Sequence, residues 1–214
     1  IRDDWLRLVG SEMCIRDRLH GYPIEIRSLA DFGPIPEAEE NGATFEENAY
    51  LKASLTARVL GIPALADDSG LLVDALGGAP GVLSARFAGP QATDAQRCER
   101  ILLELQGKSD RRAAYECVLS IDVPTGTALT YTGRCEGHIA EKPVGINGFG
   151  YDPIFYYPPL RMTFAQLTRQ EKSRVSHRGR ALDELKSEFD KVLIWIEQQM
   201  PLQERFDCQH LPHG

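Results

Sequence analysis

The stretch AAYECVLSIDV (residues 113–123), the turn PTG (124–126) and the stretch ALTYTGRCEGHI (128–139) together decide the fold class of this chain. Both longer runs are strand-like, and the segment between them carries a proline and a glycine, which are turn formers. Two such runs around a short turn are typical of an antiparallel hairpin. The sequence therefore predicts two neighbouring antiparallel strands in the middle of the chain.

Further strands are predicted on the N-terminal side of this hairpin. Residues 22–29 alternate apolar and charged side chains, which is the pattern of a strand with one buried face. The short apolar run 63–66 ends abruptly at Asp67 and Asp68, so it reads as a strand that delivers polar groups to an edge or cleft.

Three helices are predicted from capping residues and apolar spacing. Thr44 begins a capping box with Glu47, and this helix is expected to end near Gly61. Thr93 begins a second helix that runs to Gly107. Residues 176–199 are predicted to form one long helix. Its apolar face comprises Leu182, Leu185, Phe189, Val192 or Leu193, and Ile196. Helices and strands without strict alternation indicate an α/β fold with a mixed sheet, in two lobes with a cleft between them.

Composition excludes several classes of protein. The 214 residues carry 24 Lys and Arg against 31 Asp and Glu, a net charge of −7, so neither nucleic acid nor a membrane is expected as a partner. No apolar run approaches the roughly 18 residues of a transmembrane helix, and residues 1–20 lack a signal-peptide core. A cytoplasmic location with reduced, buried thiols is expected, because the cysteines are odd in number and widely spaced. They are Cys14, Cys98, Cys117, Cys135 and Cys208.

Acidic residues cluster in two places. One cluster lies between residues 37 and 47 and fits either a solvated loop and helix start or a source of metal ligands. The other is the pair Asp67 and Asp68, whose like charges repel unless a cation lies between them. Metal binding or general-base chemistry is the favoured interpretation of this pair. Three isolated carboxylates, Asp74, Asp94 and Asp122, are interpreted as surface or capping residues.

Two further segments carry candidate binding groups. The loop GINGFGYDP (145–153) has three glycines that let a ligand approach the backbone, although it also fits a simple tight turn. Within it, Phe149 offers a face for stacking a base and Asp152 an acceptor. Five potential cations between residues 172 and 180 crowd the predicted start of the long helix. They oppose the helix dipole there, which favours a bound anion or carbonyl group over a solvated basic face.

Five motifs taken together resemble one enzyme family. They are TFEENA with KA (44–49, 52–53), ADDSGL (66–71), GGAPG with SAR (77–81, 84–86), GFGYDP (148–153) and SHRG (176–179). In this order they resemble the inosine/xanthosine triphosphate pyrophosphatase family. The resemblance implies a homodimeric, Mg²⁺-dependent enzyme that hydrolyses ITP, dITP and XTP to the monophosphate and pyrophosphate. It also implies an elongated mixed sheet whose two lobes flank a central substrate cleft.

The resemblance assigns roles to individual residues. Asp68 is implied to be the general base and a metal ligand, and Glu39 a second metal ligand. Ser69 is implied to contact the substrate. The loop that binds the nucleoside would consist of Phe149, Gly150, Tyr151 and Asp152. The groups that face the 6-oxo purine would be Lys172, His177 and Arg178.

The N-terminus departs from the family pattern, which begins with a strand and a phosphate-gripping [ST]GNxxK turn. Residues 1–18 contain no such turn, and we interpret residues 11–18 (SEMCIRDR) as translated adapter sequence joined to a truncated gene. The pyrophosphatase domain is then expected at residues 19–200, followed by a disordered tail at 201–214. Two alternatives stay open: a pyrophosphatase for other modified nucleotides, and a nucleotide-binding protein of the same fold with impaired or no catalysis.

Overall fold

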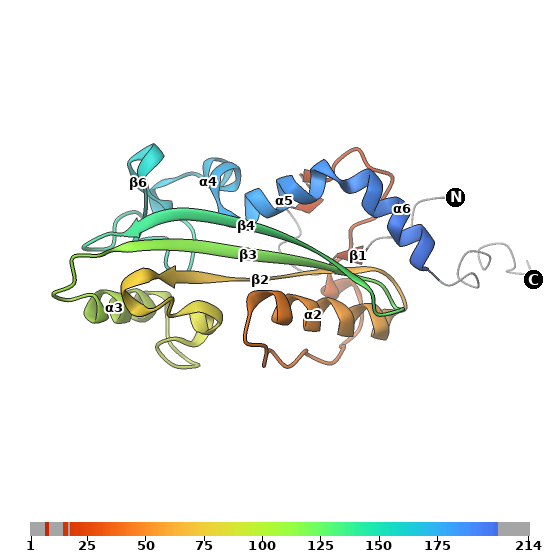
Figure 1. The fold of residues 1–214 in the computed structure, drawn as a ribbon, viewed down its shortest axis with the longest axis horizontal. Helices are drawn as coiled ribbons and strands as arrows, with labels where there is room; N and C mark the ends of the chain where they lie inside the picture. The colour runs from red at the N-terminus through yellow and green to blue at the C-terminus, as the bar shows by residue number, and fades with distance from the viewer. Residues whose placement is uncertain (1–6, 9–14, 17, 201–214) are drawn as a thin grey trace, which may run out of the picture.

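The computed structural model describes residues 7–8, 15–16 and 18–200 of the chain. Its six strands form one sheet in the order β1-β2-β3-β4-β5-β6 (Figure 1). The strands are β1 (Arg7–Leu8), β2 (Ala64–Val73), β3 (Arg112–Asp122), β4 (Ala128–Ile139), β5 (Phe155–Tyr157) and β6 (Met162–Thr163). The α-helices are α2 (Phe45–Leu60), α3 (Asp94–Glu104), α4 (Arg169–Val175), α5 (His177–Ser187) and α6 (Phe189–Gln199).

The predicted hairpin is confirmed and forms the centre of the sheet. Strands β3 and β4 pair antiparallel from Arg112 opposite His138 to Asp122 opposite Ala128. Strand β2 runs antiparallel to β3 over its whole length, whereas β1 and β2 are parallel, so the sheet is mixed. These long strands give the molecule an elongated shape (Figure 1). The predicted α/β fold with a mixed sheet is therefore confirmed.

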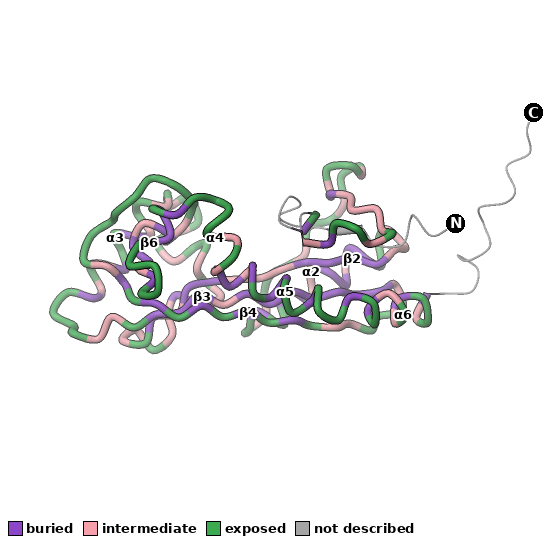
Figure 2. Tube along the Cα trace, turned by 90° about the horizontal axis from the view of Figure 1, so that it is seen from above, coloured by how far each residue is buried: buried purple, intermediate pink, exposed green. Residues whose placement is uncertain are grey.

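Two hydrophobic clusters share this sheet, and Figure 2 shows buried residues running along β2, β3 and β4 between them. The first cluster joins β2, β3 and β4 to α5 and α6. The second joins the other end of the same strands to α3 and β5. The predicted apolar face from Leu182 to Ile196 belongs to the first cluster. None of the described helices is long and apolar enough to cross a membrane.

Helices α2 and α3 begin where their capping residues predict. The Thr44 hydroxyl accepts from the Glu47 amide at 3.1 Å, and Gly61 ends α2 with a left-handed φ of 68°. The Glu47 carboxylate reaches the amide of Ala43, one residue before the expected Thr44 amide. Thr93 caps α3 through a complete capping box.

Four local predictions are wrong. Strand β2 does not end at the aspartates but continues through them to Val73. The predicted strand at residues 22–29 is absent: Ile24 and Ile26 pack against the first cluster, but the segment joins no sheet ladder, and Leu29 begins a short 3-10 helix. The predicted helix 176–199 is two helices, because Glu188 leaves the helical conformation with φ −115° and ψ 6°. Asp122, interpreted as a surface or capping residue, is fully buried.

Helix α5 lies very close to the sheet at Gly133 of β4. A Cβ at this position would overlap the backbone of His177 and Ala181, so glycine is required for the close approach. Side chains of α5 also bond to β4, since Glu184 accepts from the Thr132 amide at 3.0 Å and Arg180 donates to the Arg134 carbonyl at 2.8 Å. The start of α5 is therefore held over the middle of the sheet.

Candidate active site

Asp68 receives two hydrogen bonds from one face of α2. The Lys52 ammonium donates to Oδ1 at 2.9 Å, and the Asn48 amide donates to Oδ2 at 3.3 Å. Asn48 and Lys52 are four residues apart, so they project from the same side of the helix. Burial raises the pKa of Asp68 and outweighs the opposing effect of Lys52 and Asn48. This carboxyl therefore holds a proton more readily than an ordinary surface aspartate does, which suits proton transfer.

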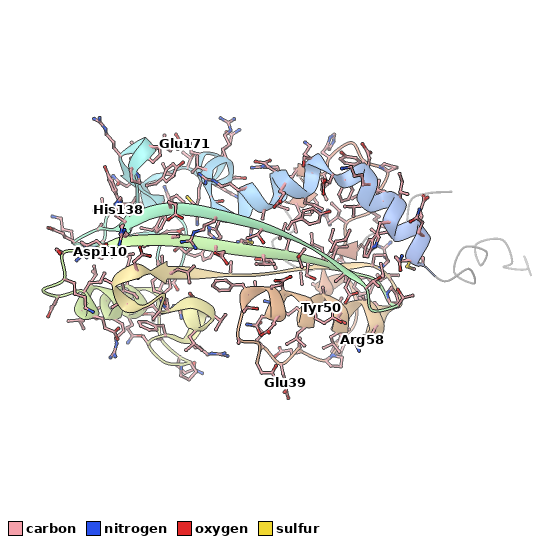
Figure 3. The ribbon with its side chains drawn as sticks, in the orientation of Figure 1. Glu39, Tyr50, Arg58, Asp110, His138 and Glu171 are labelled. Carbon is pink, nitrogen blue, oxygen red and sulfur yellow. The ribbon has the colours of Figure 1, made fainter. Side chains whose placement is uncertain are left out.

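A glutamate extends this cluster, but it is not the predicted one. Glu40 lies 3.5 Å from the Lys52 ammonium and shares it with Asp68. Glu39 is exposed and points outward from the loop before α2 (Figure 3). Within the described ranges, no three His, Cys, Asp or Glu side chains are grouped closely enough to enclose a metal ion. Carboxylate oxygens beside a cleft nevertheless form the donor set that a hard divalent cation takes, usually with water and substrate oxygens as its other ligands.

The Asp67 side chain lies on the opposite face of the sheet from Asp68. Neighbouring side chains in a strand alternate in direction, and while Asp68 faces α2, Asp67 bonds to α5. Its Oδ2 accepts from Nη2 of Arg178 at 2.6 Å and from Nε at 3.2 Å. Each aspartate therefore has its own cation, Lys52 for Asp68 and Arg178 for Asp67. These cations offset the repulsion between the two adjacent negative charges. Ser69, partly buried one residue beyond Asp68, lies on the Asp67 side of the strand.

The glycine loop is organised from within by Asp152. This buried carboxylate accepts from the Phe149 amide at 3.0 Å and forms an ion pair with Lys172 of α4. The Lys172 ammonium also lies 4.4 Å from the centre of the Phe149 ring, which is 63% exposed. Tyr151 is buried beneath the loop, and its hydroxyl donates to the Ser84 carbonyl at 2.8 Å.

A cavity of about 640 Å³ lies between this loop and the helices α4 and α5. Phe149, Lys172, His177 and Arg178 all line it, so four of the predicted substrate residues share one space. A second cavity of about 600 Å³ lies between residues 29–40 and α2, and its lining includes Lys52 and Asp67. The ion pair of Asp67 with Arg178 borders both cavities and brings the acidic and the basic clusters together.

The basic cluster differs from its prediction in one respect. Lys172 and Arg174 belong to the last turn of α4, where the helix dipole favours cations. Only His177, Arg178 and Arg180 lie at the start of α5, where Ser176 is the N-cap. The unfavourable charge arrangement at this helix start is thus smaller than the sequence suggests.

His177 is a neutral, buried imidazole in the wall of the first cavity. Its ring stacks on Tyr115 with a centroid distance of 4.6 Å, and no described residue bonds to Nδ1. Burial lowers the pKa of His177 well below its ordinary value, and the charges of Arg178 and Lys172 lower it further. The ring therefore stays uncharged at neutral pH.

This burial predicts a dependence of stability on pH. The unfolded chain protonates His177 near pH 6.5 whereas the folded chain does not, so the contribution of this residue to stability is lost as pH falls below that value. The slope due to one proton is at most about 1.4 kcal/mol per pH unit. In urea unfolding at pH 7.5, 6.5 and 5.5, His177→Gln should flatten the slope, and His138→Gln, at an exposed histidine, should keep it. An unchanged slope in His177→Gln would contradict the prediction.

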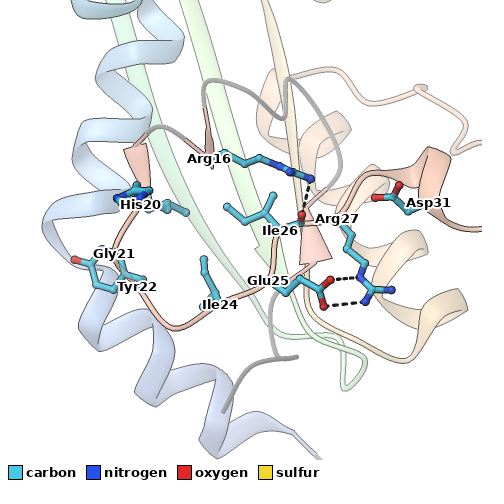
Figure 4. A pocket seen from close by; sticks show the side chains of 10 residues that line it. Arg16, His20, Gly21, Tyr22, Ile24, Glu25, Ile26, Arg27 and Asp31 are labelled. Atoms are coloured by element: carbon cyan, nitrogen blue, oxygen red, sulfur yellow. Dashed lines mark hydrogen bonds and ion pairs between the residues drawn. The ribbon is translucent and has the colours of Figure 1, made fainter. Parts of the chain in front are cut away.

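The largest of these cavities, about 710 Å³, contains none of the predicted site residues (Figure 4). It lies at residues 16–31, where Arg27 pairs with Glu25 and Arg16 donates to the Ile26 carbonyl at 2.8 Å. It lies beside the first hydrophobic cluster, against which its lining residues Tyr22, Ile24 and Ile26 pack. Size alone therefore does not identify the site.

The sequence did not predict the contacts of several residues at the site. Lys52 occurs in a quoted motif, and its spacing of four from Asn48 places both on one helix face, but nothing local indicates that Asp68 is their target. Asp94, interpreted as a surface or capping residue, accepts a hydrogen bond from the amide of Gly150 at 2.6 Å.

The described free thiols Cys98, Cys117 and Cys135 are buried as expected. Cys14 and Cys208 lie outside the described residues.

Comparisons with known proteins agree with this geometry. Residues 11–188 match the model of the Ham1 family. A dITP/XTP pyrophosphatase of Syntrophobacter fumaroxidans is 63% identical over 187 residues, which are 87% of this chain and 81% of that protein. One of Desulfotalea psychrophila is 58% identical over 85% of this chain and 82% of that protein. A HAM1 protein structure from Coxiella burnetii superimposes with a TM-score of 0.83 at 41% identity, covering 88% of this chain and all of that one.

Proposed function

The chain belongs to the Ham1 family, and from that premise we propose that it hydrolyses deaminated purine nucleoside triphosphates, namely ITP, dITP and XTP, to the monophosphate and pyrophosphate. One observation carries the proposal most strongly. The cavity lined by Phe149, Lys172, His177 and Arg178 borders the Asp67–Arg178 ion pair, and the next residue, Asp68, is the partly buried carboxyl whose pKa is raised. This adjacency supports a nucleotide whose base lies in the cavity and whose phosphates extend toward the acidic cluster.

The first cavity supplies the recognition of the base. The exposed Phe149 ring offers a face for stacking. The cations Lys172 and Arg178 donate hydrogen bonds that a 6-oxo group accepts, whereas the 6-amino group of adenine would itself donate. Adenine therefore leaves those donors unpaired, at about 1–3 kcal/mol each. Losing two such contacts gives a discrimination of about a hundredfold or more.

Asp68 is proposed as the general base for hydrolysis. Its carboxylate would accept a proton from the attacking water, which then adds to the α-phosphorus as pyrophosphate leaves. The raised pKa of Asp68 favours this proton transfer, and Lys52 holds the carboxylate in place. Ser69, on the Asp67 side of the same strand, is proposed to contact the substrate. Most of the rate enhancement then comes from orientation and electrostatics.

A divalent cation, proposed to be Mg²⁺, fits the acidic cluster. Asp68 would hold it together with a glutamate of the preceding loop, for which the resemblance favours Glu39 and the observed contacts favour Glu40. When bound, it would neutralise phosphate charge and orient the leaving pyrophosphate. Lys52 already bridges Asp68 and Glu40, which identifies this position as one that attracts positive charge.

Pyrophosphate release is the test of this function. Purified protein with Mg²⁺ should release pyrophosphate from dITP, ITP and XTP with kcat/KM about a hundredfold or more above the value for dATP. Nothing observed favours the alternative of a binding protein without catalysis. Equal turnover of dATP and dITP, or full activity in the presence of a chelator, would contradict the proposal.

Three expectations stay predictions of the proposed function. The resemblance implies a homodimer and, with the composition, a cytoplasmic location. The domain limits, a non-family stretch at 1–18, a catalytic domain at 19–200 and a tail at 201–214, also stay predictions. The tail and most of residues 1–18 lie outside the described residues.

A further inference from the structure

Helix α3 holds both polar atoms of the Gly150 backbone. The Gly150 amide donates to Oδ2 of Asp94 at 2.6 Å, and Sγ of Cys98 donates to the Gly150 carbonyl at 3.4 Å. Asp94 and Cys98 are four residues apart, so they lie on one face of the first turns of α3. The amide of Gly150 lowers the pKa of Asp94, so this carboxylate is charged at neutral pH.

The Asp94 carboxylate is itself held in place. It forms an ion pair with Arg97, whose guanidinium also donates to the carbonyls of Ala85 at 2.9 Å and Ala92 at 2.7 Å. The acceptor for Gly150 is thus attached to a rigid element and braced by a second side chain.

The loop that Asp94 restrains has intrinsic freedom. Gly145, Gly148 and Gly150 all adopt positive φ angles, and such glycines reach many other conformations at little cost. Phe149 lies between two of them, and its amide bonds to Asp152, the partner of Lys172. Fixing Gly150 therefore fixes the direction of the Phe149 ring and the place of the Lys172 ammonium.

We infer that Asp94 is a positioning residue for the purine half of the substrate, acting through Gly150, with Cys98 as a second support. This inference rests on the proposed function, because it gives the loop a base to bind. We call the two bonds from Asp94 and Cys98 to the Gly150 backbone the clamp. A preorganised loop loses less conformational entropy when the ligand binds, so the clamp contributes to affinity. It does not touch the reacting phosphate, so the chemical step is left almost unchanged.

Hydrogen exchange of the Gly150 amide tests the clamp without any substrate. In the wild-type protein this amide should be protected, and Asp94→Ala should speed its exchange by about tenfold or more. Asp94→Asn keeps a carbonyl acceptor and should give an intermediate rate. An unprotected Gly150 amide in the wild type, or equal exchange rates in the wild type and Asp94→Ala, would contradict the inference. This result does not depend on whether the protein hydrolyses dITP.

Steady-state kinetics tests its consequence. Asp94→Ala should raise the KM for dITP by about tenfold with kcat within about threefold, and Asp94→Asn should raise it less. Thr93→Ala is the matched control, because it weakens the cap of the same helix without removing the acceptor of Gly150. It should lower Tm and leave KM within about twofold.

An equal rise of KM in Thr93→Ala and Asp94→Ala, or a loss confined to kcat, would overturn the inference. A wild-type protein inactive on dITP would instead refute the proposed function, with the exchange result still deciding the clamp.

Discussion

Replacing Asp68 by asparagine is expected to lower kcat for dITP hydrolysis by about a thousandfold or more, because the variant loses both the proton acceptor and a charged ligand for the metal. The fold should survive. Asparagine keeps an oxygen for the bond from Lys52 but loses the acceptor for the Asn48 amide, and it removes a charge that burial disfavours, as the raised pKa of Asp68 indicates. The lost bond and the removed charge act in opposite directions, so we expect Tm to stay within a few degrees of the wild-type value.

The same change at a different carboxylate provides the control. Asp74→Asn alters a half-exposed side chain that pairs with Arg112 at 3.4 Å and lies just past the end of β2, six residues beyond Asp68. Its kcat and Tm should match those of the wild type. An Asp68→Asn protein that keeps a tenth or more of the wild-type kcat would exclude Asp68 as the general base.

Replacing Lys172 by methionine is expected to have the largest effect on stability. It leaves the Asp152 carboxylate, whose side chain is 2% exposed, without its cation. Removing one partner of a buried ion pair costs about 3 kcal/mol or more, which corresponds to a fall in Tm of about 10 °C in a protein of this size. The kcat/KM for dITP should fall by more than about a hundredfold, because a donor to the 6-oxo group is lost as well.

A double variant separates these two roles of Lys172. Adding Asp152→Asn to Lys172→Met removes the unpaired charge but keeps an acceptor for the Phe149 amide. Urea unfolding should show most of the lost stability regained, whereas activity on dITP should not return. A single variant as stable as the wild type would refute the structural role, and a double variant with restored activity would refute the role in recognition.

Local signals in the sequence were enough for the hairpin and for the starts of α2 and α3. Thr44 and Thr93 cap the amides of residues within their own first turns, so the sequence contains both partners of each contact. The continuation of β2 through Asp67 and Asp68 depends on distant partners instead. Arg178 lies 111 residues away from Asp67, and no local pattern in the sequence predicts that Arg178 neutralises the Asp67 carboxylate.

The break between α5 and α6 shows a different limit. The apolar spacing continues through Glu188 without a proline or glycine, and Leu185 and Phe189 on either side are both fully buried. Periodicity identifies the buried face correctly but does not reveal a change of direction that keeps the face buried. Residues 22–28 are the reverse case, since their apolar side chains pack as in a strand while the backbone joins no ladder.

Residue types at the site were predictable, but their partners were not. The motifs indicated Phe149, Lys172, His177 and Arg178, and the structure places all four around one cavity. Asp94 gave no signal beyond its place at a helix start, because its bond to Gly150 spans 56 residues. Asp122 gave the wrong signal, because a lone aspartate in the last turn-proximal positions of a strand usually faces solvent, whereas this one is the buried last residue of β3.

The position of bond cleavage can be read from the fate of oxygen in labelled water. Hydrolysis of dITP by the wild-type protein in H₂¹⁸O with Mg²⁺ should place one ¹⁸O in the monophosphate and leave pyrophosphate unlabelled, since water adds at the α-phosphorus beside Asp68. Label in pyrophosphate, or release of inorganic phosphate in its place, would show that the nucleotide does not lie across the two clusters as proposed.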